Sequence, residues 1–479
     1  MDLNEIKFVH MLGVNGISMS GLAEILLSRG IRLSGSDLTS SSRTDRLTQM
    51  GATIYYGNSA DNIKPVDLPD LLVYTAAAGP ENPERVAAAK YGVRSVDRAE
   101  LLGVIMAGHK KSIGVAGTHG KTTTTSMLAS ICVACGMDAT INVGGELDLI
   151  GGNSRIGGSE LFLAEACEYT DSFLKLRPWV AVITNVEYDH SDYFRDFSHM
   201  LSSFARFAGQ ASAIVVINAD DEGAQAVRIR LAKDMRARLT EAVKTRMVYR
   251  STRWVTFGVK AQDADFTAQY IDYDENNNAS FIIVSRNVEF SARIRLRVPG
   301  LHNVYNALAA AATAMSAGCR LESVITGLER FEGVKKRFEY KGAVGGYNIV
   351  DDYAHHPTEV RCTLETARKY ARAGRVICVF QPHTYTRTRT FLKEFAEAFT
   401  LADYTLLADI YPAREKDPGD ISSSMLADAI KLAGGDAAYF SGGFSEIARW
   451  IRVNAAAGDL VLTMGAGLAS IVADILLSR

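Results

Sequence analysis

Residues 110–136, KKSIGVAGTHGKTTTTSMLASICVACG, constrain the fold of this chain more than any other segment. Their apolar start predicts a buried strand, and the Gly-Lys-Thr-Thr after the glycine turn predicts the first turn of a helix. The backbone N–H groups and the positive end of such a helix point at a bound phosphate. The segment therefore predicts a nucleoside triphosphate site on a parallel α/β sheet.

Within this loop, the lysine is expected to reach the terminal phosphates and the next threonine hydroxyl to ligate Mg²⁺. The full Walker pattern has a glycine five positions before Gly120, where this chain has Val115. An ordinary glycine turn before a helix is the alternative, but Gly-Lys-Thr-Thr after an apolar strand favours the phosphate site. The predicted ATP contacts in the loop are Gly117, Thr118, His119, Gly120, Lys121, Thr122 and Thr123.

Two further segments begin with the same order of strand, glycine turn and helix, which predicts α/β architecture throughout. One starts at residues 6–30, continues with a strand ending at Asp37, and runs through a strand at 71–79 and an alanine-rich helix to about residue 107. The other starts near residue 335 and contains the strands of VICVFQPH, YTLLADIY and LVLTMGAG. At about 150 residues per domain, the length predicts three domains. The expected domains are residues 1–108, 109–333 and 334–479.

The composition is typical of a folded, soluble protein, because 47% of the residues are hydrophobic and 22% are charged. The net charge of −2 gives no sign of a nucleic-acid surface. No apolar run is long enough for a membrane helix, and the N-terminus lacks the features of a secretory signal. Six cysteines in so long a chain are typical of reduced thiols. We therefore expect a cytoplasmic protein with no nucleic-acid partner and no membrane insertion.

Three local features have more than one interpretation. Cys132-Val133-Ala134-Cys135 has the spacing of zinc and redox sites, but it stands late on a predicted helix with no second pair, which favours structural thiols. Residues 228–253 hold nine Lys or Arg and two acids, which favours a solvated helix or loop over a patch for a partner. Residues 266–285 predict a hairpin that turns at DENNN.

The first glycine loop, GVNGISMSG at 13–21, is similar to a dinucleotide-binding loop, but Asn15 and Ser18 occupy two of its three glycine positions. Asp37 follows about 20 residues later at a strand end, where an acid can bind a ribose hydroxyl. The residues themselves support two interpretations equally: a nicotinamide site, and a Rossmann-like turn with no redox cofactor.

Polar side chains also end other predicted strands, at LAEACE (163–168) and VITNVEYDH (182–190). Ligands of open α/β sheets bind at such strand ends, and carboxylate and imidazole donors suit Mg²⁺ or Mn²⁺ beside phosphates. Capped loops are the alternative. Later in the chain, HNVYN at 302–306 opens an alanine-rich helix, where capping is again the alternative. Six of the nine histidines lie in the phosphate loop, in these motifs and in DDYAHHP and QPHTYTR, which argues against random core placement.

In their order, these motifs resemble those of the Mur ligases, the ATP-dependent enzymes that form amide bonds in peptidoglycan precursor synthesis. The resemblance covers nearly the whole chain. It rests on GTHGKTTTT at 117–125, NVEYDH at 185–190, PGLHNVYNALAA at 299–310, DDYAHHPTE at 351–359, QPHTYTRT at 381–388 and DIYPARE at 409–415.

The family fold implies a Rossmann-like UDP-sugar domain, a central P-loop ATPase domain and a C-terminal Rossmann-like domain that admits an amino acid. The implied reaction begins when ATP phosphorylates the lactoyl carboxylate of UDP-N-acetylmuramate to an acyl phosphate. The amine of L-alanine then attacks, and a tetrahedral intermediate expels phosphate. This activity implies a role in cell-wall biogenesis, and so in cell shape, cell division and the cell cycle, for a monomer or homodimer.

The resemblance also implies roles for single residues. Lys121 holds the β- and γ-phosphates, Thr122 and Glu168 ligate one Mg²⁺ (or Mn²⁺), and His190 ligates a second metal ion. The implied catalytic residues are Lys121, Glu168, His190, His355 and Arg387, and the implied amino-acid site is Tyr353, His355 and Arg387. Further implied ATP contacts are Asn185, His302, Asn303, Asn306 and Arg337. The implied UDP-sugar contacts are Gly13, Asn15, Gly16, Ser18, Met19, Ser20, Asp37 and Thr75.

Two departures from the family pattern affect these roles. Asn15 and Ser18 leave less room for a pyrophosphate than the glycines usual in this loop. Thr384 stands where many members carry an arginine. Loss of one charge-assisted hydrogen bond would weaken substrate binding roughly 10- to 150-fold unless another group substitutes.

The resemblance favours the branch of the family that adds L-alanine. Ligases that add later residues carry a lysine shortly after the Asp-His motif, and this chain has no lysine from Arg177 through Leu231. A ligase that recycles a murein tripeptide shares His119 and AHHPT, but the serine-rich residues 34–47 and YPARE favour the alanine branch. Outside the family, a nicotinamide oxidoreductase would leave the phosphate loop unexplained. A non-enzymatic ATP-gated scaffold would require the altered first loop to have lost sugar binding.

Overall fold

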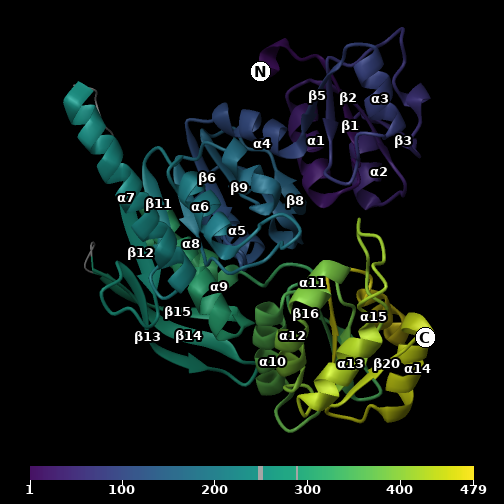
Figure 1. Ribbon diagram of the computed structural model, residues 1–479. Coiled ribbons are helices and arrows are strands. Elements are labelled where there is room, and N and C mark those ends of the chain that lie inside the picture. The colour runs from purple at the N-terminus through teal and green to yellow at the C-terminus, as the bar shows by residue number, and fades with distance from the viewer. Residues whose placement is uncertain (246–251, 287–289, 479) are drawn as a thin grey trace. The chain divides into compact units, whose positions relative to one another are not determined.

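The computed structural model describes residues 1–245, 252–286 and 290–478, with the backbone alone for 234–245 (Figure 1). The chain forms two compact units. The first contains Met1–Val186, Met200–Thr267 and Leu308–Gly327, and the second contains Glu187–His199, Ala268–Ala307 and Leu328–Arg479. Three separate sheets with helices between their strands confirm the predicted α/β class.

The N-terminal sheet is entirely parallel, in the order β3-β2-β1-β4-β5. Its strands are β1 (Phe8–Leu12), β2 (Arg32–Asp37), β3 (Thr53–Tyr56), β4 (Leu71–Tyr74) and β5 (Arg94–Asp97), and its helices are α1 (Ile17–Ser28), α2 (Ser42–Gln49), α3 (Pro83–Lys90) and α4 (Arg98–Ala107), with short 3₁₀ turns at Leu3–Glu5 and Ala60–Asn62. The prediction of a single alanine-rich helix up to residue 107 is wrong, because the structure has two helices, α3 and α4, with β5 between them. Gly92, with φ of 72°, follows the end of α3, and the Asp97 side chain caps α4 by accepting from the Glu100 amide at 2.9 Å, so that β5 forms between two helices.

The central sheet of the first unit has the order β12-β11-β10-β6-β9-β7-β8, parallel except for the β7–β8 pair. Its strands are β6 (Lys111–Ala116), β7 (Thr140–Leu147), β8 (Gly152–Arg155), β9 (Leu161–Glu165), β10 (Val180–Ile183), β11 (Ile214–Asn218) and β12 (Arg253–Gly258). The helices of this part of the chain are α5 (Lys121–Ala134), α6 (Phe197–Ala208), α7 (Glu222–Thr245), α8 (Leu301–Ser316) and α9 (Leu321–Arg330), with 3₁₀ segments at Asp148–Ile150 and Tyr169–Lys175. The apolar strand β6 is buried from Ser112 onward, as a central parallel strand requires.

The predicted hairpin forms from β13 (Phe266–Tyr273) and β14 (Asn278–Ser285), and Asn277 has the positive φ of 62° that the turn needs. A third antiparallel strand, β15 (Phe290–Pro299), pairs with β14. The basic segment 228–253 lies only partly within the described residues. Its backbone is helical to Thr245, whereas the side chains of 234–251 fall outside them.

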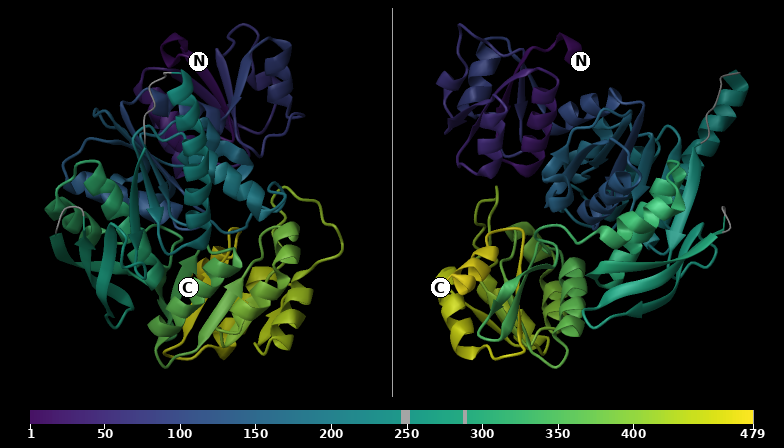
Figure 2. Two further views of the ribbon diagram at one scale, coloured as in Figure 1. Left: turned by 60° about the vertical axis from the view of Figure 1, so that its left-hand side comes forward. Right: turned by 180° about the vertical axis from the view of Figure 1, so that it is seen from behind.

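The C-terminal sheet has the order β16-β17-β21-β18-β19-β20, and only the β16–β17 pair is antiparallel. Alternate strand residues face α10, α12 and α13 on one side and α14 and α15 on the other, so both faces are covered (Figures 1 and 2). The elements are β16 (Glu339–Val344), β17 (Tyr347–Asp352), β18 (Val376–Phe380), β19 (Tyr404–Leu407), β20 (Ala437–Tyr439), β21 (Leu460–Met464), α10 (Pro357–Ala371), α11 (Tyr385–Thr390), α12 (Leu392–Phe399), α13 (Ser423–Leu432), α14 (Gly443–Asn454) and α15 (Ser470–Leu477).

Two sequence expectations concern properties of the whole chain. All six cysteines are free thiols, as predicted, and both members of the CxxC pair lie on or next to the end of α5. Among the described residues, no helix is both long enough and apolar enough to span a bilayer.

A buried polar cluster fixes the N-terminal sheet. His10 of β1 and Glu84 of α3 are both fully buried, with 2.6 Å between Nε2 and a carboxylate oxygen. His10 Nδ1 lies 2.7 Å from the Ser34 hydroxyl, and the Ser36 hydroxyl donates to Glu84 at 2.8 Å. Glu84 also accepts from the Asn62 amide at 3.0 Å. One carboxylate thus joins two strands, one helix and a loop.

We expect Glu84→Ala to destabilise the N-terminal sheet by about 3–5 kcal/mol, because it leaves a buried imidazole and hydroxyl without their acceptor. Hydrogen exchange of the β1 and β2 amides would measure the loss. Asp67→Asn is the matched control, since Asp67 pairs with Arg32 in the same sheet but both are about half exposed. Equal protection in the two variants would contradict the structural role of Glu84.

Candidate active site

The loop from Gly117 to Gly120 follows β6 and places the start of α5 at the carboxyl end of the sheet. Both glycines have positive φ, 144° at Gly117 and 79° at Gly120, which side chains other than glycine rarely adopt. A Cβ atom on Gly117 would also collide with the Thr184 hydroxyl. The glycines of the predicted phosphate loop are therefore required by its backbone.

The end of β10 holds this loop in place. Asn185 accepts from the His119 amide at 2.8 Å and donates to the His119 carbonyl oxygen at 3.0 Å. Thr184 donates to the same carbonyl oxygen at 2.6 Å, and the Thr118 amide donates to the Asn185 carbonyl at 3.1 Å. Asn185, predicted as an ATP contact, thus fixes the shape of the loop. Direct contact between Asn185 and ATP stays a prediction.

Lys121 lies at the centre of the loop in a largely buried position. Its Nζ donates to the carbonyl oxygens of Gly117 at 2.5 Å and Thr118 at 3.0 Å, and it lies 3.0 Å from both carboxylate oxygens of Glu168. Burial by itself lowers the pKa of Lys121, but the charges of Glu168, Cys167 and Glu165 outweigh it and leave the pKa above its usual value. A permanent cation therefore stands where the terminal phosphates are expected.

Glu165 at the end of β9 and Glu168 just after it contact different partners, and metal ligation by Thr122 and Glu168 stays a prediction. The Thr122 hydroxyl donates to Glu165 at 3.2 Å, and the other oxygen of Glu165 accepts from the Gly144 amide at 2.5 Å. Glu168, the acid that the resemblance paired with Thr122, contacts Lys121 instead. The sequence predicted polar side chains at the end of this strand, but Glu165 was not among the predicted metal ligands. Together the three side chains offer only oxygen donors, which fits Mg²⁺ or Mn²⁺.

The first glycine loop is tightly organised around Asn15, which is 9% exposed. Its side-chain amide donates to the Thr39 carbonyl and hydroxyl oxygens at 3.2 and 3.1 Å, and its carbonyl oxygen accepts from the Ser41 hydroxyl. Its backbone amide donates to Asp37 at 3.0 Å. The Asn15 side chain is therefore committed to the segment after β2. How much room it leaves for a pyrophosphate stays a prediction.

The other predicted UDP-sugar residues differ in accessibility. Met19 and Ser20 are 2% and 1% exposed within α1, whereas Gly16 is exposed and Ser18 partly exposed at the start of that helix. Gly13, with φ of 74°, lies against Thr75, whose methyl group would be 2.6 Å from an added Cβ. The accessible members are thus Gly13, Gly16, Ser18 and Thr75, together with the partly exposed Asp37.

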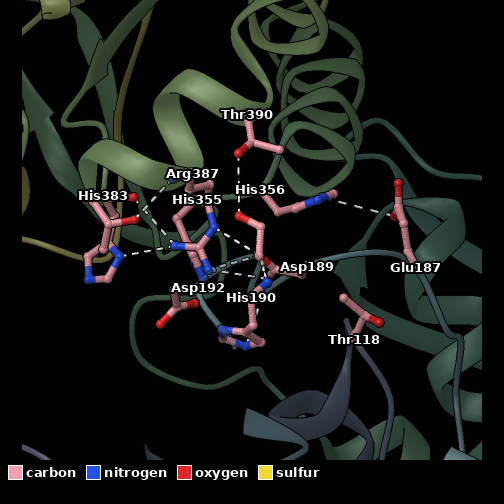
Figure 3. A network of polar contacts seen from close by, with 12 residues as sticks. Thr118, Glu187, Asp189, His190, Asp192, His355, His356, His383, Arg387 and Thr390 are labelled. Carbon is pink, nitrogen blue, oxygen red and sulfur yellow. Dashed lines mark hydrogen bonds and ion pairs between the residues drawn. The ribbon is translucent and has the colours of Figure 1, made fainter. Parts of the chain in front are cut away.

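In the second unit, Asp189 and Arg387 form an ion pair whose side chains are each less than a tenth exposed (Figure 3). Arg387 NH2 lies 3.0 Å from one carboxylate oxygen, and Nε donates to that oxygen at 3.1 Å. Burial by itself raises the pKa of Asp189, but the charge of Arg387 holds it well below its usual range. His190, which follows with φ of 52°, donates its amide to the same carboxylate at 2.7 Å.

Two histidines adjoin this pair, with ring centroids 5.8 Å apart. Burial, with a smaller contribution from the charge of Arg387, lowers the pKa of His355 to about 4 and that of His383 to about 3, so both rings are neutral at pH 7. His383 Nδ1 lies 3.1 Å from Arg387 NH1, which can only donate, so the ring proton of His383 is on Nε2. His355 Nδ1 faces the Tyr353 carbonyl oxygen at 2.9 Å.

A second group gathers at the start of α8. Asn303 donates to the Pro299 carbonyl oxygen at 2.7 Å, and Asn306 donates to Asn303 at 3.1 Å, so both asparagines stabilise the helix start. Burial, and then the charge of Arg337, lower the pKa of His302 to about 4. Arg337 itself stacks on Tyr353 with its guanidinium 5.1 Å from the ring centre. The structure therefore brings His302, Arg337 and Tyr353 together, and the adenine contact of Asn303 stays a prediction.

Three family descriptions match consecutive parts of the chain: "Mur ligase family, catalytic domain" at residues 8–110, "Mur ligase middle domain" at 115–314 and "Mur ligase, glutamate ligase domain" at 336–467. The chain belongs to the Mur ligase family, which confirms the resemblance drawn from its motifs.

Its relatives define the branch. A UDP-N-acetylmuramate–L-alanine ligase of Acetivibrio thermocellus is 45% identical over 98% of this chain and 95% of its own length. A UDP-N-acetylmuramate–L-alanine ligase of Alkaliphilus metalliredigens is 43% identical over 100% of this chain and 99% of its own length. Among solved structures, the UDP-N-acetylmuramate–alanine ligase of Thermotoga maritima matches with a TM-score of 0.79 and 28% identity. A murein peptide ligase of Psychrobacter arcticus matches with a TM-score of 0.71 and 27% identity. Each match covers 98% of both chains.

We expect Gly117→Ala to abolish binding of a non-hydrolysable ATP analogue, because the new methyl group collides with Thr184 and strains the loop. Gly136→Ala is the matched control, since Gly136 also has a positive φ of 65° but faces open space after α5. Calorimetric titration of both variants would test this. Unchanged analogue affinity in Gly117→Ala would show that the loop does not hold the phosphates.

Proposed function

We propose that this chain joins L-alanine to the lactoyl carboxylate of UDP-N-acetylmuramate, with ATP forming an acyl phosphate on that carboxylate. The observation that carries the proposal is identity of 45% along nearly the full length to a ligase with this named substrate pair. The local chemistry agrees, because a buried lysine in a glycine loop and a set of neutral histidines beside a buried arginine supply what phosphoryl transfer and amine attack require.

In the ATP-binding part, Lys121 exchanges Glu168 and two backbone carbonyls for the β- and γ-phosphate oxygens. Thr122, Glu165 and Glu168 would hold Mg²⁺ or Mn²⁺, which neutralises charge on the phosphates. Asn185 and Thr184 fix the shape of the loop through the Thr118 amide and the amide and carbonyl of His119, so that the N–H groups at the start of α5 face the phosphates. His190 as ligand of a second metal ion, and His302, Asn303, Asn306 and Arg337 as ATP contacts, remain parts of this proposal.

In the amino-acid part, the low pKa values of His355 and His383 keep both rings neutral at pH 7. His383 accepts from Arg387 at Nδ1 and keeps its proton on Nε2, so His355 is the ring that would take the proton as the amine becomes nucleophilic. Arg387 holds His383 in one tautomer and is itself fixed by Asp189. Tyr353, His355 and Arg387 thus shape the predicted amino-acid site. We further propose domains at 1–108, 109–333 and 334–479, a cytoplasmic location and a monomeric or homodimeric state.

The function is tested by phosphate release from ATP and Mg²⁺ with UDP-N-acetylmuramate, in the presence of L-alanine, glycine, L-serine or the murein tripeptide. We expect release that requires both the sugar nucleotide and L-alanine. Release that requires UDP-N-acetylmuramate and the tripeptide, and does not occur with L-alanine, would place the chain with the recycling ligases. No release with any amino acid, despite ATP binding, would refute the proposal.

We expect Lys121→Ala to lower L-alanine-dependent phosphate release about 100-fold or more while the fold is retained, because the transferred phosphoryl group loses its nearest protein cation. Lys110→Ala is the control, since Lys110 lies eleven positions earlier and pairs with Glu160 on the surface. Circular dichroism would confirm folding of both variants. A Lys121→Ala variant that keeps more than about a tenth of the activity would overturn this role of the lysine.

A further inference from the structure

The cation predicted for the amino-acid site, Arg387, is already paired with a buried carboxylate of the protein. Arg387, assigned to this site from its motif, is 7% exposed, and its guanidinium makes three contacts of 3.0–3.3 Å with the Asp189 carboxylate. Breaking such a buried pair is costly, about 3–5 kcal/mol when one partner is removed. Arg387 therefore serves Asp189 and His383, and the α-carboxylate of an amino acid needs another partner.

The next candidate position, 384, offers no charge. Thr384 has φ of 66° and caps α11 with its hydroxyl, which accepts from the Arg387 amide at 3.4 Å. Its backbone amide donates to the Tyr411 carbonyl oxygen at 2.9 Å. The polar groups of Thr384 thus hold the local backbone in place. A cation for the substrate carboxylate has to come from another residue of the unit.

The segment around Tyr411 is fixed against the segment that carries His383. The Tyr411 amide donates to the Pro382 carbonyl oxygen at 2.8 Å, and the Tyr411 ring stacks on His383 with centroids 5.7 Å apart. Glu415 accepts from the Thr386 amide at 2.9 Å. These contacts, two at Tyr411 before Arg414 and one at Glu415 after it, bring residues 411–415 alongside residues 382–386.

Arg414 lies between these contacts in the chain and pairs with Asp192. The residue before it, Ala413, has φ of 51°, which turns the backbone, and Arg414 NH2 lies 3.4 Å from a carboxylate oxygen of Asp192. Burial, the neighbouring His355 and Arg387, and then Arg414 lower the pKa of His383, which places the Arg414 charge within electrostatic range of that ring. Figure 3 shows Asp192 near His190 in the same network.

We propose that Arg414 binds the α-carboxylate of the amino-acid substrate and so compensates for the uncharged Thr384. This inference rests on the proposed function and specifies which residue recognises one end of its amino acid. Its Asp192 pair is suited to exchange, because Arg414 is 50% exposed and the pair spans 3.4 Å. Exposed pairs of this kind contribute little to stability, so a substrate carboxylate can replace Asp192 at small cost.

The inference predicts a specific kinetic pattern for Arg414→Gln. We expect the KM for L-alanine to rise about 10- to 100-fold, because one charge-assisted hydrogen bond to a carboxylate is lost. The kcat, and the KM values for ATP and UDP-N-acetylmuramate, should stay unchanged. Arg414→Lys should recover part of the affinity, since it keeps the charge but not the planar guanidinium.

L-Alaninamide supplies the decisive comparison, because it keeps the reacting amine and lacks the carboxylate. The unsubstituted chain should strongly prefer L-alanine to L-alaninamide. Arg414→Gln should lose most of that preference, because its KM for L-alanine rises while its KM for L-alaninamide stays the same. Arg389→Gln is the matched control, since Arg389 is about half exposed in α11 and pairs with Asp420 at 2.6 Å. It should leave the preference intact.

The outcomes separate the two proposals. An unsubstituted chain that releases phosphate with L-alanine, together with an Arg414→Gln variant of unchanged KM and unchanged preference over the amide, overturns the inference alone. A fall in kcat with no change in the L-alanine KM also overturns it. No L-alanine-dependent release from the unsubstituted chain overturns the proposed function, and the inference with it.

Discussion

The buried ion pair between Asp189 and Arg387 determines how the predicted amino-acid site is organised. It joins the Asp-His motif to α11, and it removes both charges from solvent without leaving either unpaired. The cost of separating such charges makes the pair a fixed element. His383 and His355 are then held in a buried position beside a permanent cation, and burial together with that cation keeps the pKa of both rings low and the rings neutral. The tautomer of His383 follows from the same contact, because a guanidinium has no acceptor.

A second fixed element is the loop that holds Lys121. Its shape is set by two glycines with positive φ and by hydrogen bonds from Thr184 and Asn185 to one carbonyl group. The lysine is paired with Glu168 and two carbonyl oxygens, all of which carry negative or partial negative charge. Phosphate oxygens have the same character, so a nucleotide can take their place without leaving a buried cation unsatisfied.

The sequence predicted the architecture well because strands, glycine loops and helix starts are local features. The three α/β segments, the hairpin after residue 266 and the phosphate loop all form where their patterns indicated them. The helix expected through residue 107 was the exception. Its alanines favour a helix on either side, whereas Gly92 and the capping side chain of Asp97 interrupt it, and parallel pairing with β4 makes a strand of the four residues between.

The partners of individual side chains were harder to predict, because they depend on atoms brought together by the tertiary fold. The sequence showed that acids end β9 but not that Glu165 rather than Glu168 would receive the Thr122 hydroxyl. It showed Asn15 in a place usual for glycine, but not that this side chain would bind the Thr39 and Ser41 segment. It placed Arg387 in the amino-acid site, which stays a prediction, but did not show that this arginine would pair with Asp189.

Position 384 shows that comparing a motif with its family pattern one residue at a time does not establish whether a substrate group keeps its partner. A threonine in place of an arginine suggests a weakened site if each position is considered separately. What a carboxylate requires, however, is a guanidinium at a point in space, and that point can be reached from more than one segment. The contacts of Tyr411 and Glu415 hold residues 411–415 beside residues 382–386, so the charge can be supplied from either. Recognition of the amino acid then depends on the pairing of these two segments, and a substitution that loosens the Tyr411 contacts would act on the substrate carboxylate without touching it.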